Sequence, residues 1–211
     1  MIWERAKDLT EILNWAENPR IEGLSLDTAN ISVAGFSLGG HSALAISGLQ
    51  VSKVKFIEYC DRNADIWDCG WLSRGGVDFT EINADLYDAR SLDNCVGATI
   101  AIDPALAPAA IIESAARISH PVIVINFKPH QGVPKALDAA RITEVMPNAR
   151  YKAIPQSWHF SFLPECSLLG KIVIGLGGEE NICSDWKLWD RSDVHQALTN
   201  QIVPFLDESL K

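Results

Sequence analysis

The sequence predicts an α/β fold in which a mostly parallel sheet is flanked by helices. Two observations lead to this prediction. Apolar runs of strand length recur along the chain, at residues 31–36, 97–103, 121–127 and 149–155. Stretches with helical patterning separate these runs, and strands that alternate with helices form a parallel sheet covered on both faces.

The N-terminal part of the chain predicts a helix followed by the first strand. Apolar residues recur at helical spacing over residues 3–17: Ile2, Ala6, Leu9, Leu13 and Ala16. Pro19 and Gly23 then end the helix. The buried strand 31–36 leads into a helix over 38–49, whose small residues allow it to pack closely on that strand.

The rest of the chain follows the same alternation after one irregular insertion. Residues 51–96 are rich in turn formers and predict short helices and loops rather than sheet. Helices are expected over 109–117 and 133–146, before the last two strands. The terminal helix, 192–210, carries one apolar stripe, and Pro204 is expected to kink it. No repeat or linker is present, so we expect a single domain.

Composition and charge restrict the partners that the protein can have. The 211 residues include 27 acidic and 18 basic side chains, a formal net charge of −9. Nucleic acids and anionic membranes attract clustered Lys and Arg, so neither is expected as the main partner. No apolar run reaches the roughly 20 residues that span a bilayer. The N-terminus also lacks the basic start and apolar centre of a secretory signal.

The five cysteines leave two redox states open. Cys60 and Cys69 flank a short polar loop, Cys166 and Cys183 flank a glycine-rich one, and Cys95 remains. No CxxC motif and no zinc spacing occurs. Two loop-closing disulfides with one remaining thiol, and five reduced cysteines, both fit this pattern. Disulfides would indicate a periplasmic or secreted setting.

The stretch "VAGFSLGG" holds a candidate nucleophile. Ser37 lies between Gly35 and Gly39 at Gly-x-Ser-x-Gly spacing, directly between a predicted strand and a predicted helix. Glycines allow the sharp turn that raises a serine oxygen above the carboxyl end of its strand. The N-terminus of the next helix faces that oxygen, and the N–H of Leu38 is placed to bind a developing oxyanion. An inert serine in a tight turn is the alternative interpretation.

A serine nucleophile needs a base, and His159 is the favoured candidate. It follows the last predicted strand, in "QSWHFSF", at the same end of the sheet as Ser37. His130 also follows a strand at that end. His41 is expected to face away from the reacting side, and His120 lies at the opposite end of the sheet. We interpret the histidines other than His159 as surface or core residues: His41, His120, His130 and His195.

The candidate acid is Asp103, in "AIDPAL". It stands at the carboxyl end of a predicted strand that Pro104 terminates. The loop after strand 121–127 is the other position at which a strand end could supply an acid, but it holds no carboxylate between Phe127 and Leu137. Asp138 is the fallback, although the predicted helix around it indicates a surface position. An Asp before Pro is also a common start of a turn.

These motifs resemble the α/β-hydrolase superfamily. More narrowly, the chain is similar to the plasma-type platelet-activating-factor acetylhydrolases and to the bacterial predicted dienelactone hydrolases. The resemblance covers "ISVAGFSLGGHSAL", "ATIAIDPAL", "ISHPVIVIN" and "WHFSFLPECSLLGK". It implies that Ser37 is the nucleophile, Asp103 the acid and His159 the base. It further implies hydrolysis of carboxylic esters with small acyl groups, without a cofactor or metal, and cysteines in similar places favour the two disulfides.

The sequence departs from this family at its beginning. The related proteins place four strands before the nucleophile, and a loop among them supplies a second oxyanion donor. Here a single predicted helix precedes strand 31–36, so the N-terminal strands of the fold are missing. Strand 31–36 would then expose a sheet edge. Either the chain is a fragment or a partner covers this edge, and our hypothesis is a homo-oligomer that pairs through it.

Two functions from different classes follow from these observations. The first is a serine esterase for small-molecule esters, with Trp158, Phe160 and Phe162 expected near an acyl pocket. A serine at position 37 argues against true dienelactone hydrolase activity, which usually uses a cysteine. The second is a truncated, non-catalytic hydrolase homologue that is stable as an oligomer. Labelling of Ser37 by a fluorophosphonate separates the two.

Overall fold

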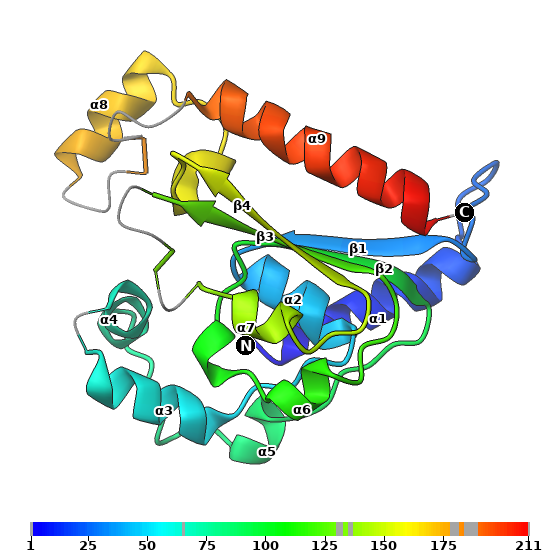
Figure 1. Cartoon of the computed structure of the whole chain (residues 1–211), viewed down its shortest axis with the longest axis horizontal. Coiled ribbons are helices and arrows are strands. Elements are labelled where there is room, and N and C mark those ends of the chain that lie inside the picture. The colour runs from blue at the N-terminus through cyan, green and yellow to red at the C-terminus, as the bar shows by residue number, and fades with distance from the viewer. Residues whose placement is uncertain are drawn as a thin grey trace.

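A computed structural model describes residues 2–64, 66–129, 133–134, 137–177, 182–183 and 190–210. It confirms the predicted α/β class. Four parallel strands form one sheet in the order β1-β2-β3-β4 (Figure 1). Each strand lies within one residue of its predicted range: β1 Ile31–Phe36, β2 Val96–Ile102, β3 Val122–Lys128 and β4 Ala149–Pro155.

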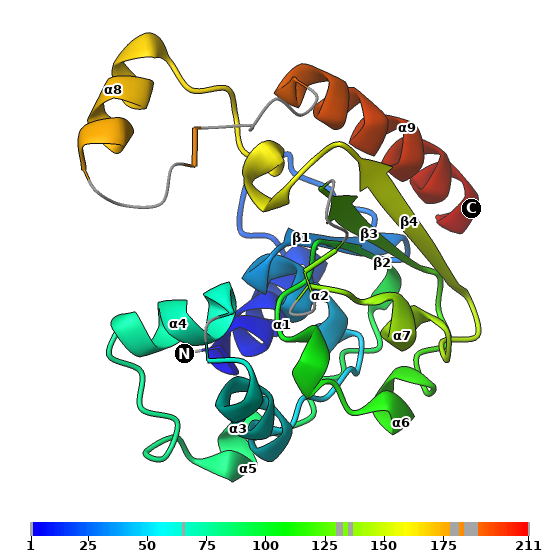
Figure 2. The same cartoon turned by 60° about the vertical axis from the view of Figure 1, so that its left-hand side comes forward.

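Helices cover both faces of the sheet, as the doubly apolar strands require. On one face, Ala101, Val122 and Val124 pack against Leu44 of α2 (Leu38–Ile46) and Ile142 of α7 (Ala140–Thr143). On the other face, the alternate strand residues pack against α9 (Arg191–Ser209): Ile100, Ile123 and Ile125 contact the cluster that includes Val194, Leu198 and Phe205. Figures 1 and 2 show α9 on one side of the sheet and α2, α6 and α7 on the other.

The two ends of the chain flank this sheet. The first helix, α1 (Glu4–Glu17), packs on α2 through a small cluster that includes Ala6, Ile46 and Val96. The last helix, α9, continues past Pro204 to Ser209. Within the described part of the chain β1 pairs only with β2, and Ala34 at the centre of β1 is exposed. The sheet therefore has an open edge at β1.

The insertion after α2 consists of short helices and loops. These helices are α3 (Lys53–Arg62), α4 (Trp67–Arg74) and α5 (Ala84–Tyr87). A disulfide between Cys60 and Cys69 joins α3 to α4, and a second one joins Cys166 to Cys183. Cys95 is a free, exposed thiol. The cysteines therefore adopt the oxidised alternative, with two loop-closing disulfides.

Two predicted helices are much shorter than expected. The segment 109–117 contains the end of a 3-10 helix, η1 (Ala107–Ala109), and one turn, α6 (Ile112–Ala115). Within the described residues of 133–146, only α7 is helical. Asp138 is exposed, as the sequence suggested.

Buried Asn126 of β3 accounts for the late start of the second of these helices, which begins only at Ala140. Its amide donates to the carbonyl of Leu137 (2.6 Å), and its oxygen accepts from the N–H of Ala139 (3.2 Å). Those backbone groups are therefore unavailable to a regular helix. The side chain of a strand residue outcompetes the local helical preference because it would otherwise be buried without partners.

One helix lies where the sequence suggested a glycine-rich loop. It is α8 (Leu168–Leu176), and the Ser167 hydroxyl caps it by accepting from the N–H of Gly170 (3.1 Å). None of its residues is buried, and Figure 2 shows it standing away from the sheet. Although α8 is apolar it has nine residues, and no helix in the described ranges is long and apolar enough to cross a membrane.

His41 of α2 is a buried histidine. Its side chain is 5% exposed, and its Nδ1 atom has no hydrogen-bond partner among the described residues. Burial, and to a smaller extent the positive charge of Arg5, lowers the pKa of His41 to about 4. The folded protein therefore holds this imidazole neutral at physiological pH.

Replacing His41 by Leu should reduce the fall in the free energy of unfolding as pH decreases from 7 to 5. In the unfolded chain this histidine titrates near pH 6.5, so the unfolded state binds the proton first as pH falls. We expect the free energy of unfolding of the wild type to drop by about 2 kcal/mol from pH 7 to pH 5 through this group. Urea denaturation of wild type and His41→Leu at both pH values measures the difference. An equal drop in both proteins would contradict this role.

Candidate active site

Ser37 stands at a sharp turn between β1 and α2. Its backbone has φ 56° and ψ −120°, a conformation that costs a non-glycine residue about 1–3 kcal/mol. Three backbone hydrogen bonds hold it there. Its N–H donates to Ile102 (2.9 Å), and its carbonyl accepts from His41 (3.0 Å) and Ala105 (3.0 Å). The turn is thus anchored to the end of β2 and lifts the hydroxyl above the sheet.

The glycines around Ser37 contribute differently from what the motif suggested. A Cβ on Gly35 would lie 2.1 Å from the carbonyl oxygen of Gly39, an impossible overlap. A Cβ on Gly40 would meet the backbones of Gly35, Ile102 and Pro104, each at 3.1 Å. A Cβ on Gly39 would meet nothing within 4 Å. The close approach therefore requires glycine at position 35 and makes position 40 tight for any larger residue. The prediction that the turn also needs glycine at position 39 is not supported by this geometry.

Asp103 follows β2 and is held by three neighbours. Its Oδ1 atom accepts from the Asn126 amide (2.8 Å) and the N–H of Phe127 (2.9 Å). Its Oδ2 atom lies 2.8 Å from Nδ1 of His159. The side chain is 1% exposed, and its backbone has φ 44°. These donors satisfy the carboxylate and fix its orientation away from water.

His159 lies between Asp103 and Ser37. It begins the short 3-10 helix η2 (His159–Phe162) after β4, and its Nε2 atom is 3.0 Å from the Ser37 hydroxyl. Because a carboxylate accepts only, Nδ1 donates to Asp103, which leaves Nε2 to accept the serine proton. The ring also contacts Phe36, with ring centroids 4.6 Å apart. The hydrogen bond to Asp103 and the contact with Phe36 together fix the orientation of the imidazole.

The other histidines occupy different environments. His120 lies at the opposite end of the sheet, 2.8 Å from the hydroxyl of Thr99. His195 of α9 donates from Nε2 to the carbonyl of Phe162 (3.0 Å). His41 is buried under α2, and His130 lies outside the described residues. Among the histidines that the structure describes, His159 is the one within hydrogen-bond distance of Ser37.

Asn126 is the site residue that sequence reasoning missed. It connects Asp103 to the segment after β3, through the hydrogen bonds given above. The signal was present in the sequence, because Asn126 is the polar residue within the apolar run "PVIVINF". A buried amide in a central strand needs partners, and here the partners include the carboxylate.

A large apolar cavity opens beside Ser37 and His159. It has a volume of about 850 Å³, and Leu38 and Phe160 also line it. Trp158 does not belong to the lining and packs edge-to-face on Phe160, with ring centroids 4.9 Å apart. Phe162 stacks on Phe36 at 4.3 Å instead. Within the described residues, no group of three or more His, Cys, Asp and Glu side chains is arranged to hold a metal.

The sequence and the structure were compared with known proteins. No protein-family model matches the chain. No curated protein matches it either. Among solved structures, a ferulic acid esterase from Streptomyces cinnamoneus is similar, with a TM-score of 0.56 and 18% sequence identity. The match covers 99% of this chain and 48% of that one, so this chain spans about half the length of the esterase. At this identity the likeness shows a shared fold alone.

Alanine substitutions at Gly35 and Gly39 should have opposite outcomes. Gly35→Ala forces the backbone turn apart, and we expect it to lower the free energy of unfolding by about 3 kcal/mol or more. Gly39→Ala meets open space on a helix and should change it by no more than about 1 kcal/mol. Thermal denaturation followed by circular dichroism compares the two. Equal destabilisation by both would contradict the assignment of the close contact.

Proposed function

We propose that this chain is a serine hydrolase that cleaves carboxylic esters. The observation that carries the proposal is the chain of hydrogen bonds at one end of the sheet, from Ser37 through His159 to Asp103, with separations of 3.0 and 2.8 Å. The three side chains come from loops that follow β1, β4 and β2. The adjoining cavity supplies room for a substrate, and the esterase fold of a solved structure supports the same class.

In the proposed mechanism Ser37 acts as the nucleophile. Its oxygen attacks the ester carbonyl carbon while Nε2 of His159 takes its proton. The tetrahedral intermediate collapses, the C–O bond to the alcohol breaks, and His159 returns the proton to the leaving alkoxide. Water then attacks the acyl-enzyme by the same route and releases the acid. Asp103 keeps the imidazole in the required tautomer and stabilises its charged form.

The N–H of Leu38 is the donor we propose for the developing oxyanion. Leu38 begins α2 directly after Ser37 and lines the cavity, so the positive end of the helix dipole faces the reacting oxygen. In the hydrolases that the sequence resembles, a second donor comes from a loop before the nucleophile strand. Loss of one such donor typically lowers the rate by about 10²–10³. A preceding segment of that kind would raise the activity of this chain.

The same resemblance supports a small acyl group as the part of the ester that Ser37 receives. Phe160 contributes to the proposed acyl site, since it lines the cavity beside His159. The two disulfides support an oxidising compartment, periplasmic or extracellular, as the place where the protein works.

A fluorophosphonate probe tests the catalytic assignment. We expect it to label the wild type covalently and to leave Ser37→Ala unlabelled, because the probe requires an activated serine. Ser192→Ala, on the exposed start of α9, is the matched control and should label like the wild type. The wild type and Ser192→Ala should also hydrolyse p-nitrophenyl acetate, and Ser37→Ala should not. A folded wild type that neither labels nor turns over would favour the non-catalytic alternative.

The open edge of β1 supports an oligomer as a second part of the proposal. An unpaired strand edge invites pairing with another strand, and Lys on such an edge prevents it. We expect the wild type to elute as a dimer and Ala34→Lys to elute as a monomer, measured by gel filtration with light scattering. Ala64→Lys, an exposed position after α3, should stay dimeric. A wild-type monomer that does not aggregate would overturn pairing through β1.

A further inference from the structure

The cavity beside Ser37 has two walls that come from distant parts of the chain. One wall belongs to α4 and the loop after it, with Leu72, Phe79 and Ile82. The other belongs to α8 and contains Val173 and Ile174. Figures 1 and 2 show α8 and α4 on different sides of the sheet end where the strands stop. A substrate at Ser37 that fills the cavity would therefore contact α8.

The lining chemistry favours an uncharged apolar group. The carboxylate on the wall, Asp78, is already engaged, because its Oδ1 atom accepts from the N–H (2.8 Å) and the hydroxyl (2.6 Å) of Thr80. No Lys or Arg occurs among the described lining residues, so an anionic substituent would lose its hydration without a counter-charge. A volume of about 850 Å³ also far exceeds an acetyl group.

The position of α8 does not come from core packing. None of its residues is buried, and Ile172 and Leu176, which do not line the cavity, are 59% and 82% exposed. A helix with so little buried surface has little packing energy to hold it at one place. Its location must depend on the two chain segments that connect it to the rest of the protein.

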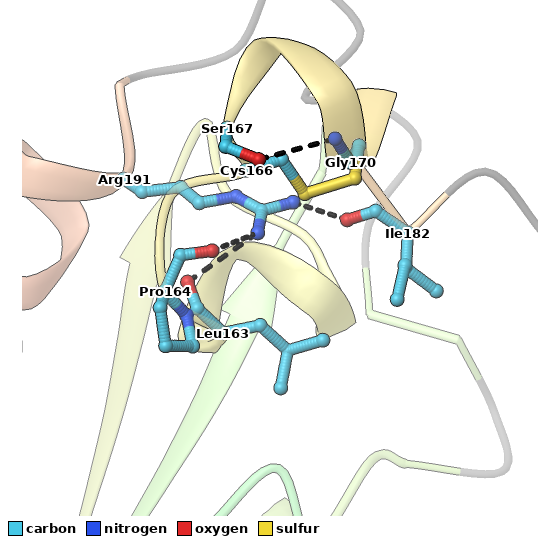
Figure 3. The surroundings of a disulfide bond; sticks show 8 residues. Leu163, Pro164, Cys166, Ser167, Gly170, Ile182 and Arg191 are labelled. Carbon is cyan, nitrogen blue, oxygen red and sulfur yellow. Dashed lines mark hydrogen bonds between the residues drawn. A yellow bond between two sulfur atoms is a disulfide. The ribbon is translucent and has the colours of Figure 1, made fainter. Parts of the chain in front are cut away.

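These two connecting segments are clamped together. The Cys166–Cys183 disulfide joins them, and Arg191 at the start of α9 holds both from the other side (Figure 3). Arg191 is 3% exposed. Its guanidinium donates to the carbonyls of Leu163 (3.4 Å), Pro164 (2.7 Å) and Ile182. Since α9 packs on the sheet, this clamp ties α8 to the core.

We propose that α8 is the specificity-determining wall of the cavity, and that it selects esters carrying a bulky, uncharged apolar group in addition to the bond that Ser37 attacks. Ile174 contacts that group. Arg191 and the Cys166–Cys183 disulfide are positioning elements that act through α8. The proposal rests on the proposed esterase function, and it adds the substrate class and the residues that select it.

Chain-length series on each side of the ester test the selectivity. One series runs from p-nitrophenyl acetate to p-nitrophenyl octanoate, and the other from ethyl acetate to octyl acetate. Because the acyl group that Ser37 receives is proposed to be small, we expect kcat/KM of the wild type to rise at least about tenfold from ethyl acetate to octyl acetate. A rise in the acyl series alone would place α8 on the acyl side and overturn the small acyl group. A flat or falling profile in both series, with acetate still hydrolysed, overturns the inference and leaves the esterase proposal standing.

Two substitutions on the same helix make a matched pair. Ile174→Ala removes apolar surface from the cavity wall, and we expect the preference for the octyl ester over the short ester to fall about tenfold, mainly through KM. Ile172→Ala makes the same change at a position that does not line the cavity and should keep the wild-type preference. Equal effects of the two substitutions would contradict α8 as a selective wall.

The clamp is tested by the same ratio of long to short ester. Cys166→Ser/Cys183→Ser and Arg191→Met should each lower the preference by about the same factor as Ile174→Ala, and Arg191→Lys should restore part of it. The ratio separates positioning from general instability, which would lower both substrates together. If a clamp variant fails to fold, the Ile174 and Ile172 pair decides. Absence of labelling and acetate turnover in the wild type would instead reject the esterase function itself.

Discussion

The buried carboxylate of Asp103 is the interaction on which the candidate site depends. It accepts hydrogen bonds from the Asn126 amide, the N–H of Phe127 and the imidazole of His159. One side chain thereby joins the end of β2 to β3 and to the loop after β4. A buried carboxylate is costly unless each oxygen has donors, so these three elements are held in one arrangement. The orientation of His159 toward Ser37 follows from that arrangement.

Backbone strain is concentrated around the same point. The non-glycine residues with positive φ in the described chain are Ser37, Asp103, Leu106 and Gln156. Ser37 and Asp103 belong to the candidate triad, and Gln156 stands in the loop that carries His159. Such conformations persist only where surrounding contacts over-determine them, and at Ser37 and Asp103 backbone hydrogen bonds to Ile102 and Ile125 in the neighbouring strands contribute to this. The rigid sheet stabilises a turn that the isolated chain would avoid.

The periphery of the site contrasts with this rigid centre. The sheet core buries apolar residues on both faces, whereas α8 buries none, and among the described residues the Cys166–Cys183 disulfide and Arg191 hold the segments that flank it. Under the proposed function, the centre of the fold positions Ser37, His159 and Asp103, and α8 shapes the space beside them. Chemistry and selectivity would then have separate structural origins.

Apolar periodicity and glycine spacing predicted the four strands, their parallel arrangement and the turn at Ser37, because both are written directly in the chain. His159 and Asp103 became candidates through their places after strands and through the resemblance to known hydrolases. Tertiary structure decided what depends on partners distant in sequence. Asn126 takes up the backbone groups of Leu137 and Ala139, within the helix expected over 133–146, and Gly40 rather than Gly39 lies against the end of β2. The glycines near α8 suggested a loop, yet the joined stems place a helix beside the cavity. A sequence records local preference, but only the fold shows which groups compete for the same hydrogen bond or the same space.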